Sequence, residues 1–243
     1  MSGHSHWSKI KHQKGVADIK RGQIFSKMNR LISVVSKEGG SDPDKNPKLR
    51  LAIEKAKSLN MPKENIERAI KKGSGEMEDV QLEEFVFEAY GPGGIAIIVE
   101  GITDNKNRVI SEIKKILGQS NGKLAGEGSV RWLFERKGVL GINSKTQELK
   151  SPEELELMLI ESGVENIIKH DDGFWDVFTK TEEAYKTKGA LEKQGVVIDS
   201  MSLDWIAKEE ISLSDKEKES CNKLFELLDE NDSVQEIYSN LKD

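Results

Sequence analysis

The chain has very little of what cross-links a protein or holds it in a membrane. Cys221 is the only cysteine among 243 residues, so neither an internal disulfide nor a cysteine-based metal cluster can form. No apolar run reaches about 18 residues, which excludes a membrane-spanning helix of ordinary length. The first residues also lack the apolar segment of a secretion signal, so a cytoplasmic location is expected.

Charge, in contrast, is abundant and unevenly distributed. Residues 1–75 contain 17 Lys and Arg against 7 Asp and Glu, whereas residues 76–243 contain 20 against 36. A protein with this asymmetry can dock on a polyanion through one end while the rest is repelled from it. We therefore predict that the partner is nucleic acid, either DNA or ribosomal RNA, and that the protein is a monomer.

Residues 1–17 show no apolar periodicity and are interpreted as an extended basic arm. Lysine and arginine bind phosphates largely by releasing condensed counterions, so this binding weakens as salt rises. Trp7 can stack on an unpaired base or pack against the neighbouring helices; the alternative for the whole arm is a solvated charged tail. The predicted nucleic-acid contacts are Trp7, Lys9, Lys11, His12, Lys14, Lys20, Arg21, Lys27, Arg30, Lys48 and Arg50.

Three amphipathic helices are predicted to follow the arm and to form a small bundle. The first covers residues 18–37 and combines an apolar stripe with an adjacent basic stripe. The second begins at Pro47, because proline is favoured at the first helical position. The third begins after Pro62 and ends at Gly73. No recognition helix with a turn signature is visible, so sequence-specific reading of the major groove is not expected.

The pattern then changes to strands. Residues 85–90 and 95–100 are strand-like and are joined by Gly-Pro-Gly-Gly, which predicts a hairpin. A helix is expected over 106–118, capped by Thr103 or Asp104. A glycine-rich loop, predicted to be flexible, then leads to a strand at 130–135.

From Gly138 the expected order is strand, helix, strand, strand, helix, strand, which is typical of a ferredoxin-like unit. A helix at 215–229 and a strand at 234–238 would complete the half-built sheet of residues 83–135. We therefore predict an α+β protein with three domains: an arm and three-helix bundle over 1–78, a discontinuous ferredoxin-like-type α+β domain over 79–136 plus 205–243, and an inserted ferredoxin-like α+β domain over 137–204.

A polar loop precedes the helix expected at 106–118. Two of its cations lie at the N-terminus of a helix, where positive charge is unfavourable unless an anion is bound nearby. This loop is predicted to contact a partner or ligand. The alternative is a structural role, since capping of the helix alone would account for Asp104 or Thr103. Its residues are Asp104, Asn105, Lys106, Asn107 and Arg108.

Few residues offer catalytic or metal chemistry. If Met1 is removed, His4 becomes the third residue and can bind Cu(II) or Ni(II) adventitiously, but no physiological metal is predicted. His170 precedes Asp171, Asp172 and Gly173, a sequence that indicates a hairpin turn more strongly than a metal-dependent hydrolase. We expect no catalytic residue, no enzymatic activity and no cofactor.

Several segments together resemble the YebC family of bacterial and organellar proteins. They are GHSHW with IKHQK, DIKRGQIF, GGSDPDKNPKLR, YGPGGIAI, TDNKNR and GSVRWLF, which span most of residues 3–134, and the resemblance returns faintly in DSVQEIYSNL. His6 departs from the pattern, because the family commonly has lysine there.

The resemblance implies the same three-domain organisation and a non-enzymatic regulator of gene expression. It favours a DNA-binding transcriptional regulator. The alternative is a ribosome-associated translation factor that relieves stalling at difficult sequences such as proline runs. In either case the resemblance assigns nucleic-acid contacts to the basic segment that contains Lys9, Lys11, His12, Lys14, Lys20, Arg21 and Lys27.

Overall fold

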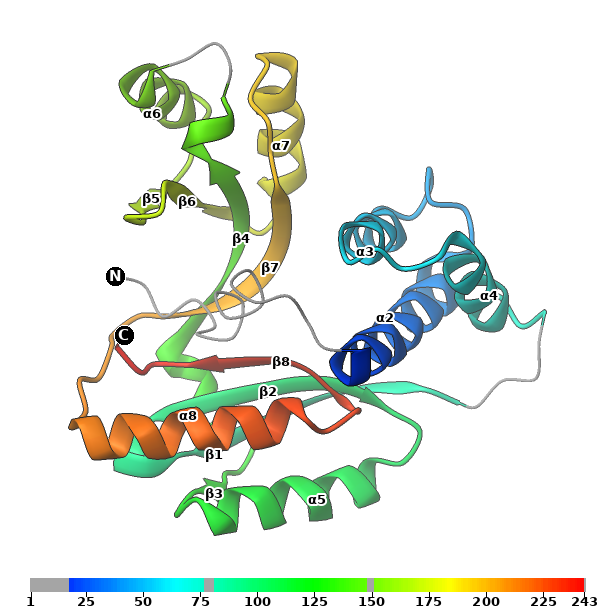
Figure 1. The fold of residues 1–243 in the computed structure, drawn as a ribbon, viewed down its shortest axis with the longest axis vertical. Helices are drawn as coiled ribbons and strands as arrows, with labels where there is room; N and C mark the ends of the chain where they lie inside the picture. The colour runs from blue at the N-terminus through cyan, green and yellow to red at the C-terminus, as the bar shows by residue number, and fades with distance from the viewer. Residues whose placement is uncertain (1–17, 77–80, 148–150, 243) are drawn as a thin grey trace.

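The computed structural model describes residues 18–76, 81–147 and 151–242. Figure 1 shows a helical bundle lying beside two four-stranded sheets, each of which carries its own pair of helices. We call the sheet of β3, β1, β2 and β8 sheet A, and the sheet of β5, β6, β4 and β7 sheet B. Residues 81–242, which contain both sheets, are called the acidic body.

The bundle forms around the apolar stripes that the sequence predicts. Its helices are α2 (Asp18–Gly39), α3 (Pro47–Ser58) and α4 (Lys63–Gly73). Met28, Ile32 and Leu49 are among its buried side chains. Asn46 caps α3 by accepting a hydrogen bond from the backbone N–H of Leu49 at 3.1 Å. The three predicted helices are confirmed, with the first ending two residues later than expected.

Sheet A is antiparallel, and two helices cover one of its faces (Figure 1). Its elements are β1 (Glu83–Tyr90), β2 (Ala96–Thr103), α5 (Lys106–Gln119), β3 (Lys123–Leu124), α8 (Asp215–Asp229) and β8 (Val234–Ser239). The predicted hairpin is confirmed: β1 pairs with β2, and the turn between them is the short helix η1 (Pro92–Gly94). Strand β8, near the C-terminus, pairs with β2. This confirms the prediction that a strand at 234–238 completes the sheet of residues 83–135.

The glycine-rich loop after α5 is not the open flexible loop that was predicted. Strand β3 pairs with β1, and the buried carboxylate of Glu88 accepts hydrogen bonds from the backbone N–H groups of Gly128, Val130 and Arg131 at 2.7 to 2.9 Å. Residues Arg131–Leu133 form the short helix η2, so the strand expected at 130–135 begins only at Phe134. A single buried acid thus fixes a loop of small residues.

Sheet B confirms the predicted strand–helix–strand–strand–helix–strand order. Its elements are β4 (Phe134–Asn143), η3 (Ser144–Thr146), α6 (Pro152–Glu161), β5 (Asn166–Lys169), β6 (Phe174–Lys180), α7 (Ala184–Lys193) and β7 (Ser200–Ala207). The strand order β5-β6-β4-β7 is that of a ferredoxin-like sheet. The predicted domain boundaries at 136/137 and 204/205 fall within β4 and β7.

The two sheets share an apolar cluster. Ala96 and Ile98 on the outer face of sheet A pack with Phe134 at the start of β4 and with residues near the end of β7, including Trp205. Hydrophobic burial therefore joins both halves of the acidic body. The α+β fold with an N-terminal helical bundle is confirmed.

Candidate nucleic-acid interface

The basic stripe of α2 turns toward the acidic body. The side chain of Lys27 is only 8% exposed, and its Nζ lies 2.8 Å from Asp229 Oδ1 and 2.6 Å from the backbone oxygen of Asp229. Because α8 ends at Asp229, the ammonium also lies at the negative end of the helix dipole. In this arrangement Lys27 is covered, so its predicted contact with nucleic acid would require the body to move away.

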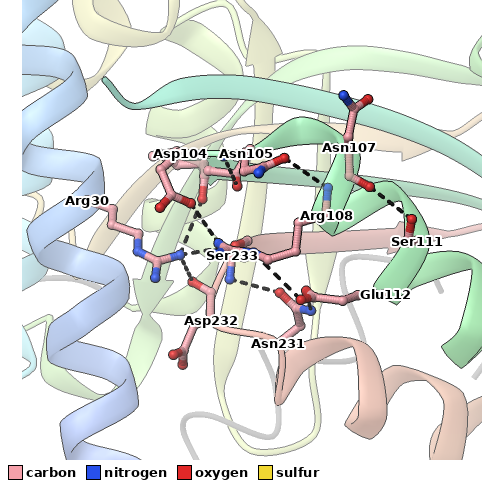
Figure 2. Close-up of polar contacts among 12 residues, drawn as sticks. Arg30, Asp104, Asn105, Asn107, Arg108, Ser111, Glu112, Asn231, Asp232 and Ser233 are labelled. Atoms are coloured by element: carbon pink, nitrogen blue, oxygen red, sulfur yellow. Dashed lines mark hydrogen bonds and ion pairs between the residues drawn. The ribbon is translucent and has the colours of Figure 1, made fainter. Parts of the chain in front are cut away.

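Arg30 lies three residues after Lys27 in α2 and forms hydrogen bonds to the loop that follows α8 (Figure 2). Its guanidinium donates to the backbone oxygen of Asp232 at 2.9 Å and to Ser233 Oγ at 3.1 Å. The turn is itself braced, since Asn231 Nδ2 donates to Glu112 Oε2 on α5 at 2.8 Å. Arg30 was also predicted to contact nucleic acid, and here it anchors the bundle.

The polar loop before α5 is largely paired within itself (Figure 2). Asn105 Oδ1 accepts from the backbone N–H of Arg108 at 3.0 Å, so Asn105 is the helix cap and the expectation of Thr103 or Asp104 was wrong. Asp104 forms an ion pair with Arg108 at 2.6 Å, which reduces the unfavourable charge at the helix N-terminus. Lys106 and Asn107 remain exposed. A ligand at this loop stays a prediction.

The remaining predicted contacts lie in two places. Arg21, Lys48 and Arg50 are exposed on the bundle, with Lys48 Nζ 3.3 Å from Glu38 and Arg50 donating to the backbone oxygens of the loop before α3. The side chain of Lys20 is not described. His4, Trp7, Lys9, Lys11, His12 and Lys14 lie outside the described residues.

The bundle has further exposed cations that were not predicted to contact nucleic acid. Lys57 lies in the last turn of α3, and Arg68 and Lys71 lie on the exposed face of α4, all without an ion pair to a described residue. The sequence carried a signal for Lys57 and Lys71, since two lysines lie in the last turn of both α3 and α4. Cations there are also favoured by the helix dipole, which supplies a purely structural reason for them.

Three parts of the protein meet at a polar junction on the outer face of sheet A. Glu100 Oε1 on β2 accepts from Arg136 of β4 at 2.9 Å and from Trp205 Nε1 of β7 at 2.7 Å. Lys55 of α3 forms an ion pair with Glu236 of β8 at 2.7 Å. Because the Coulombic attraction of Glu236 outweighs burial, the pKa of Lys55 is raised.

Asp204 adds a pH-sensitive group to this junction. Burial, reinforced by the negative charge of Glu236, raises the pKa of Asp204 to about 6, despite a hydrogen bond from Ser202 and the nearby cations Lys55 and Arg136. The folded state therefore holds this proton at a pH where the unfolded chain has lost it. The contribution of Asp204 to stability accordingly falls as pH rises from about 4 to about 6.

Replacing Asp204 with asparagine should remove that decline. We expect Asp204→Asn to be more stable than the wild type at pH 8 by about 1 to 2 kcal/mol, with the difference vanishing near pH 4. Urea unfolding at several pH values measures it. Asp171→Asn, at an exposed position, is the matched control and should follow the wild type. Parallel pH profiles for Asp204→Asn and the wild type would contradict the assignment.

The other chemical candidates have structural partners. The predicted hairpin turn is confirmed, because β5 pairs with β6 and Gly173 N–H donates to the backbone oxygen of His170 at 2.9 Å; His170 Nε2 lies 2.7 Å from Asp176 Oδ2. Cys221 is buried in sheet A's helical layer, and burial raises the pKa of its thiol to about 11. Within residues 18–76, 81–147 and 151–242, no group of three or more His, Cys, Asp or Glu is placed to hold a metal ion. No helix in these ranges is long and apolar enough to cross a bilayer.

These features define a three-part α+β protein in which a basic helical bundle is held by ion pairs against an acidic body. The chain belongs to the TACO1/YebC family: residues 5–76 match the model of the family's N-terminal domain, and residues 82–241 match that of its second and third domains.

Similar proteins cover the whole length of the chain. Proteins from Dehalococcoides mccartyi (strain BAV1) and Persephonella marina, each named "Probable transcriptional regulatory protein", are 45% identical over 99% and 100% of this chain and 94% and 96% of their own lengths. The crystal structure of a conserved hypothetical protein from Aquifex aeolicus is 42% identical, has a TM-score of 0.88, and covers 98% of this chain and 97% of its own. The names of the first two relatives describe probable regulatory proteins, whereas the name of the third states no function.

Proposed function

We propose that this protein is a non-enzymatic regulator of transcription that binds DNA through the phosphates, using its basic arm and helical bundle. The observation that carries the proposal is the charge asymmetry: 17 Lys and Arg against 7 Asp and Glu in residues 1–75, followed by an acidic remainder. The family membership and the names of the relatives support a regulatory role.

The proposed contact surface consists of the arm and the exposed side of the bundle. Lys9, Lys11 and Lys14 supply most of the arm's charge, and Arg21 and Arg50 are exposed cations on α2 and α3. Such a surface reads phosphates and groove shape rather than base edges. Its affinity should therefore depend steeply on salt and weakly on sequence.

Reversing the arm's charge tests the proposal. Replacing Lys9, Lys11 and Lys14 with glutamate should weaken binding on the order of 100-fold and lower the slope of log affinity against log salt by about 3. Fluorescence anisotropy with a labelled duplex DNA, repeated with a single-stranded RNA, measures both quantities.

The body offers a control with the same change in charge. Lys216, Lys218 and Lys223 lie on α8, and their replacement with glutamate should leave affinity within a few-fold of the wild type. Equal losses in both triple variants, or no loss in the arm variant, would contradict a docking role for the arm. Tight binding of the RNA with weak binding of the DNA would shift the proposal to an RNA target.

A further inference from the structure

Among the described residues, no buried apolar cluster spans the bundle and the acidic body, and polar contacts join the two parts. The bundle's apolar cluster contains only residues of α2, α3, α4 and their connections, whereas sheets A and B share a cluster of their own. Several polar contacts cross the boundary. They include Lys27 to Asp229, Arg30 to Asp232, Ser233 and the backbone oxygen of Ile102, Lys55 to Glu236, and Glu54 to Lys188.

Three of these contacts have the same polarity and meet one short segment. Lys27, Arg30 and Lys55 come from the bundle, and each donates to oxygen atoms of residues 229–236. The donor–acceptor distances of the ion pairs, 2.8 Å for Lys27 and 2.7 Å for Lys55, are those of charge-assisted hydrogen bonds. Carboxylate and backbone oxygens of the body thus occupy positions where phosphate oxygens would satisfy the same cations.

We propose that this face of the bundle, formed by Lys27, Arg30 and Lys55, is a second phosphate-binding surface, which the acidic body covers until nucleic acid displaces it. The proposal rests on the proposed function, since it assumes that the bundle binds nucleic acid at all. It adds a site that becomes available only when the bundle separates from the body.

Competition of this kind has a thermodynamic consequence. For nucleic acid that needs the uncovered bundle, the apparent affinity equals the intrinsic affinity multiplied by the fraction of molecules in which the bundle is free. Weakening the contact between bundle and body must therefore tighten nucleic-acid binding. By reciprocity, nucleic acid must promote separation of the two parts.

Removing the body's two competing carboxylates tests the competition without altering the bundle. We expect the double variant Asp229→Asn, Glu236→Gln to bind a labelled duplex DNA about 10-fold more tightly than the wild type at low salt. The matched control is Glu230→Gln, Asp232→Asn. It neutralises two carboxylates of the same segment whose side chains make no ion pair with a described residue, so it removes the same repulsion and breaks no contact. We expect at most a two- to three-fold gain for the control, roughly the effect of charge alone.

A conformational measurement gives an independent readout. Donor and acceptor dyes at Ser74→Cys on the bundle and Glu209→Cys on the body, both exposed, report separation by energy transfer, while Cys221 is buried. Transfer should change when DNA is added to the wild type. The Asp229→Asn, Glu236→Gln variant should show part of that change without DNA.

The outcomes separate this inference from the proposed function. Equal tightening in the competing-carboxylate variant and its control overturns the inference and leaves nucleic-acid binding intact. Binding by the Asp229→Asn, Glu236→Gln variant alone, with none by the wild type, supports a covered surface. Absence of binding in every variant overturns the proposed function and the inference with it.

Discussion

Replacing Glu88 with alanine is expected to lower the free energy of unfolding by about 3 to 5 kcal/mol, because one buried carboxylate holds an entire loop. Its two oxygens accept backbone N–H groups of Gly128, Val130 and Arg131, and its side chain is only 1% exposed. Truncation leaves these donors without their acceptor and Arg131 without its ion pair. The effect should be visible in urea unfolding at neutral pH.

The pKa of Glu88 gives this prediction a pH signature. Burial would raise the pKa, but the three backbone N–H groups and Arg131 outweigh it, so the pKa lies below its ordinary value. A carboxyl with a lowered folded pKa stabilises the protein above its unfolded pKa of about 4.3, and this contribution is lost as pH falls through the folded value. The stability difference between Glu88→Ala and the wild type should therefore shrink in acid.

An isosteric control separates the charge from the shape. Glu88→Gln keeps the size and one acceptor oxygen but presents an amide donor to a set of N–H donors, so we expect an intermediate loss of about 2 kcal/mol. Glu83→Ala, at an exposed position at the start of the same strand, should change stability by less than about 0.5 kcal/mol. A loss for Glu88→Ala no larger than that for Glu83→Ala would contradict the role of Glu88.

Elements with a local signal were predictable from the sequence. Helix α8 covers Asp215–Asp229, which is the range expected from the sequence. The hairpin between β1 and β2 followed from Gly-Pro-Gly-Gly between two strand-like runs. In each case the information lies within a few residues of the structure that it specifies.

What the sequence did not reveal depends on residues far apart in the chain. The order of the loop after α5 comes from Glu88, about forty positions earlier, which by itself reads as an ordinary acid in an amphipathic strand. Likewise, periodicity placed Lys27 on a basic stripe but could not reveal Asp229, 202 positions away, as its partner. A charged stripe predicts an oppositely charged partner, and does not tell whether that partner belongs to the same chain.

Gly101 illustrates the same point, because its small size matters only once β8 is in place. A Cβ built at this position would lie 2.1 Å from the backbone oxygen of Ser233 and 2.3 Å from Cζ of Phe85. The nearer atom is backbone, and the same oxygen accepts a hydrogen bond from Ile102 N at 2.8 Å, so it cannot move away without breaking the pairing. We expect Gly101→Ala to cost about 3 kcal/mol of stability.

Gly118 offers a control with the same substitution and the opposite sign. It lies in α5, where an added Cβ meets no atom within 4 Å, so Gly118→Ala should stabilise the protein by about 0.5 to 1 kcal/mol through helix propensity. Thermal and urea unfolding of both variants measure the contrast, and a neutral Gly101→Ala would refute the steric argument. Ser233 Oγ also accepts a hydrogen bond from Arg30 of the bundle. A backbone shift at Gly101 should therefore weaken this contact between the bundle and the body. Gly101→Ala should therefore lower energy transfer between bundle and body, as Gly118→Ala should not.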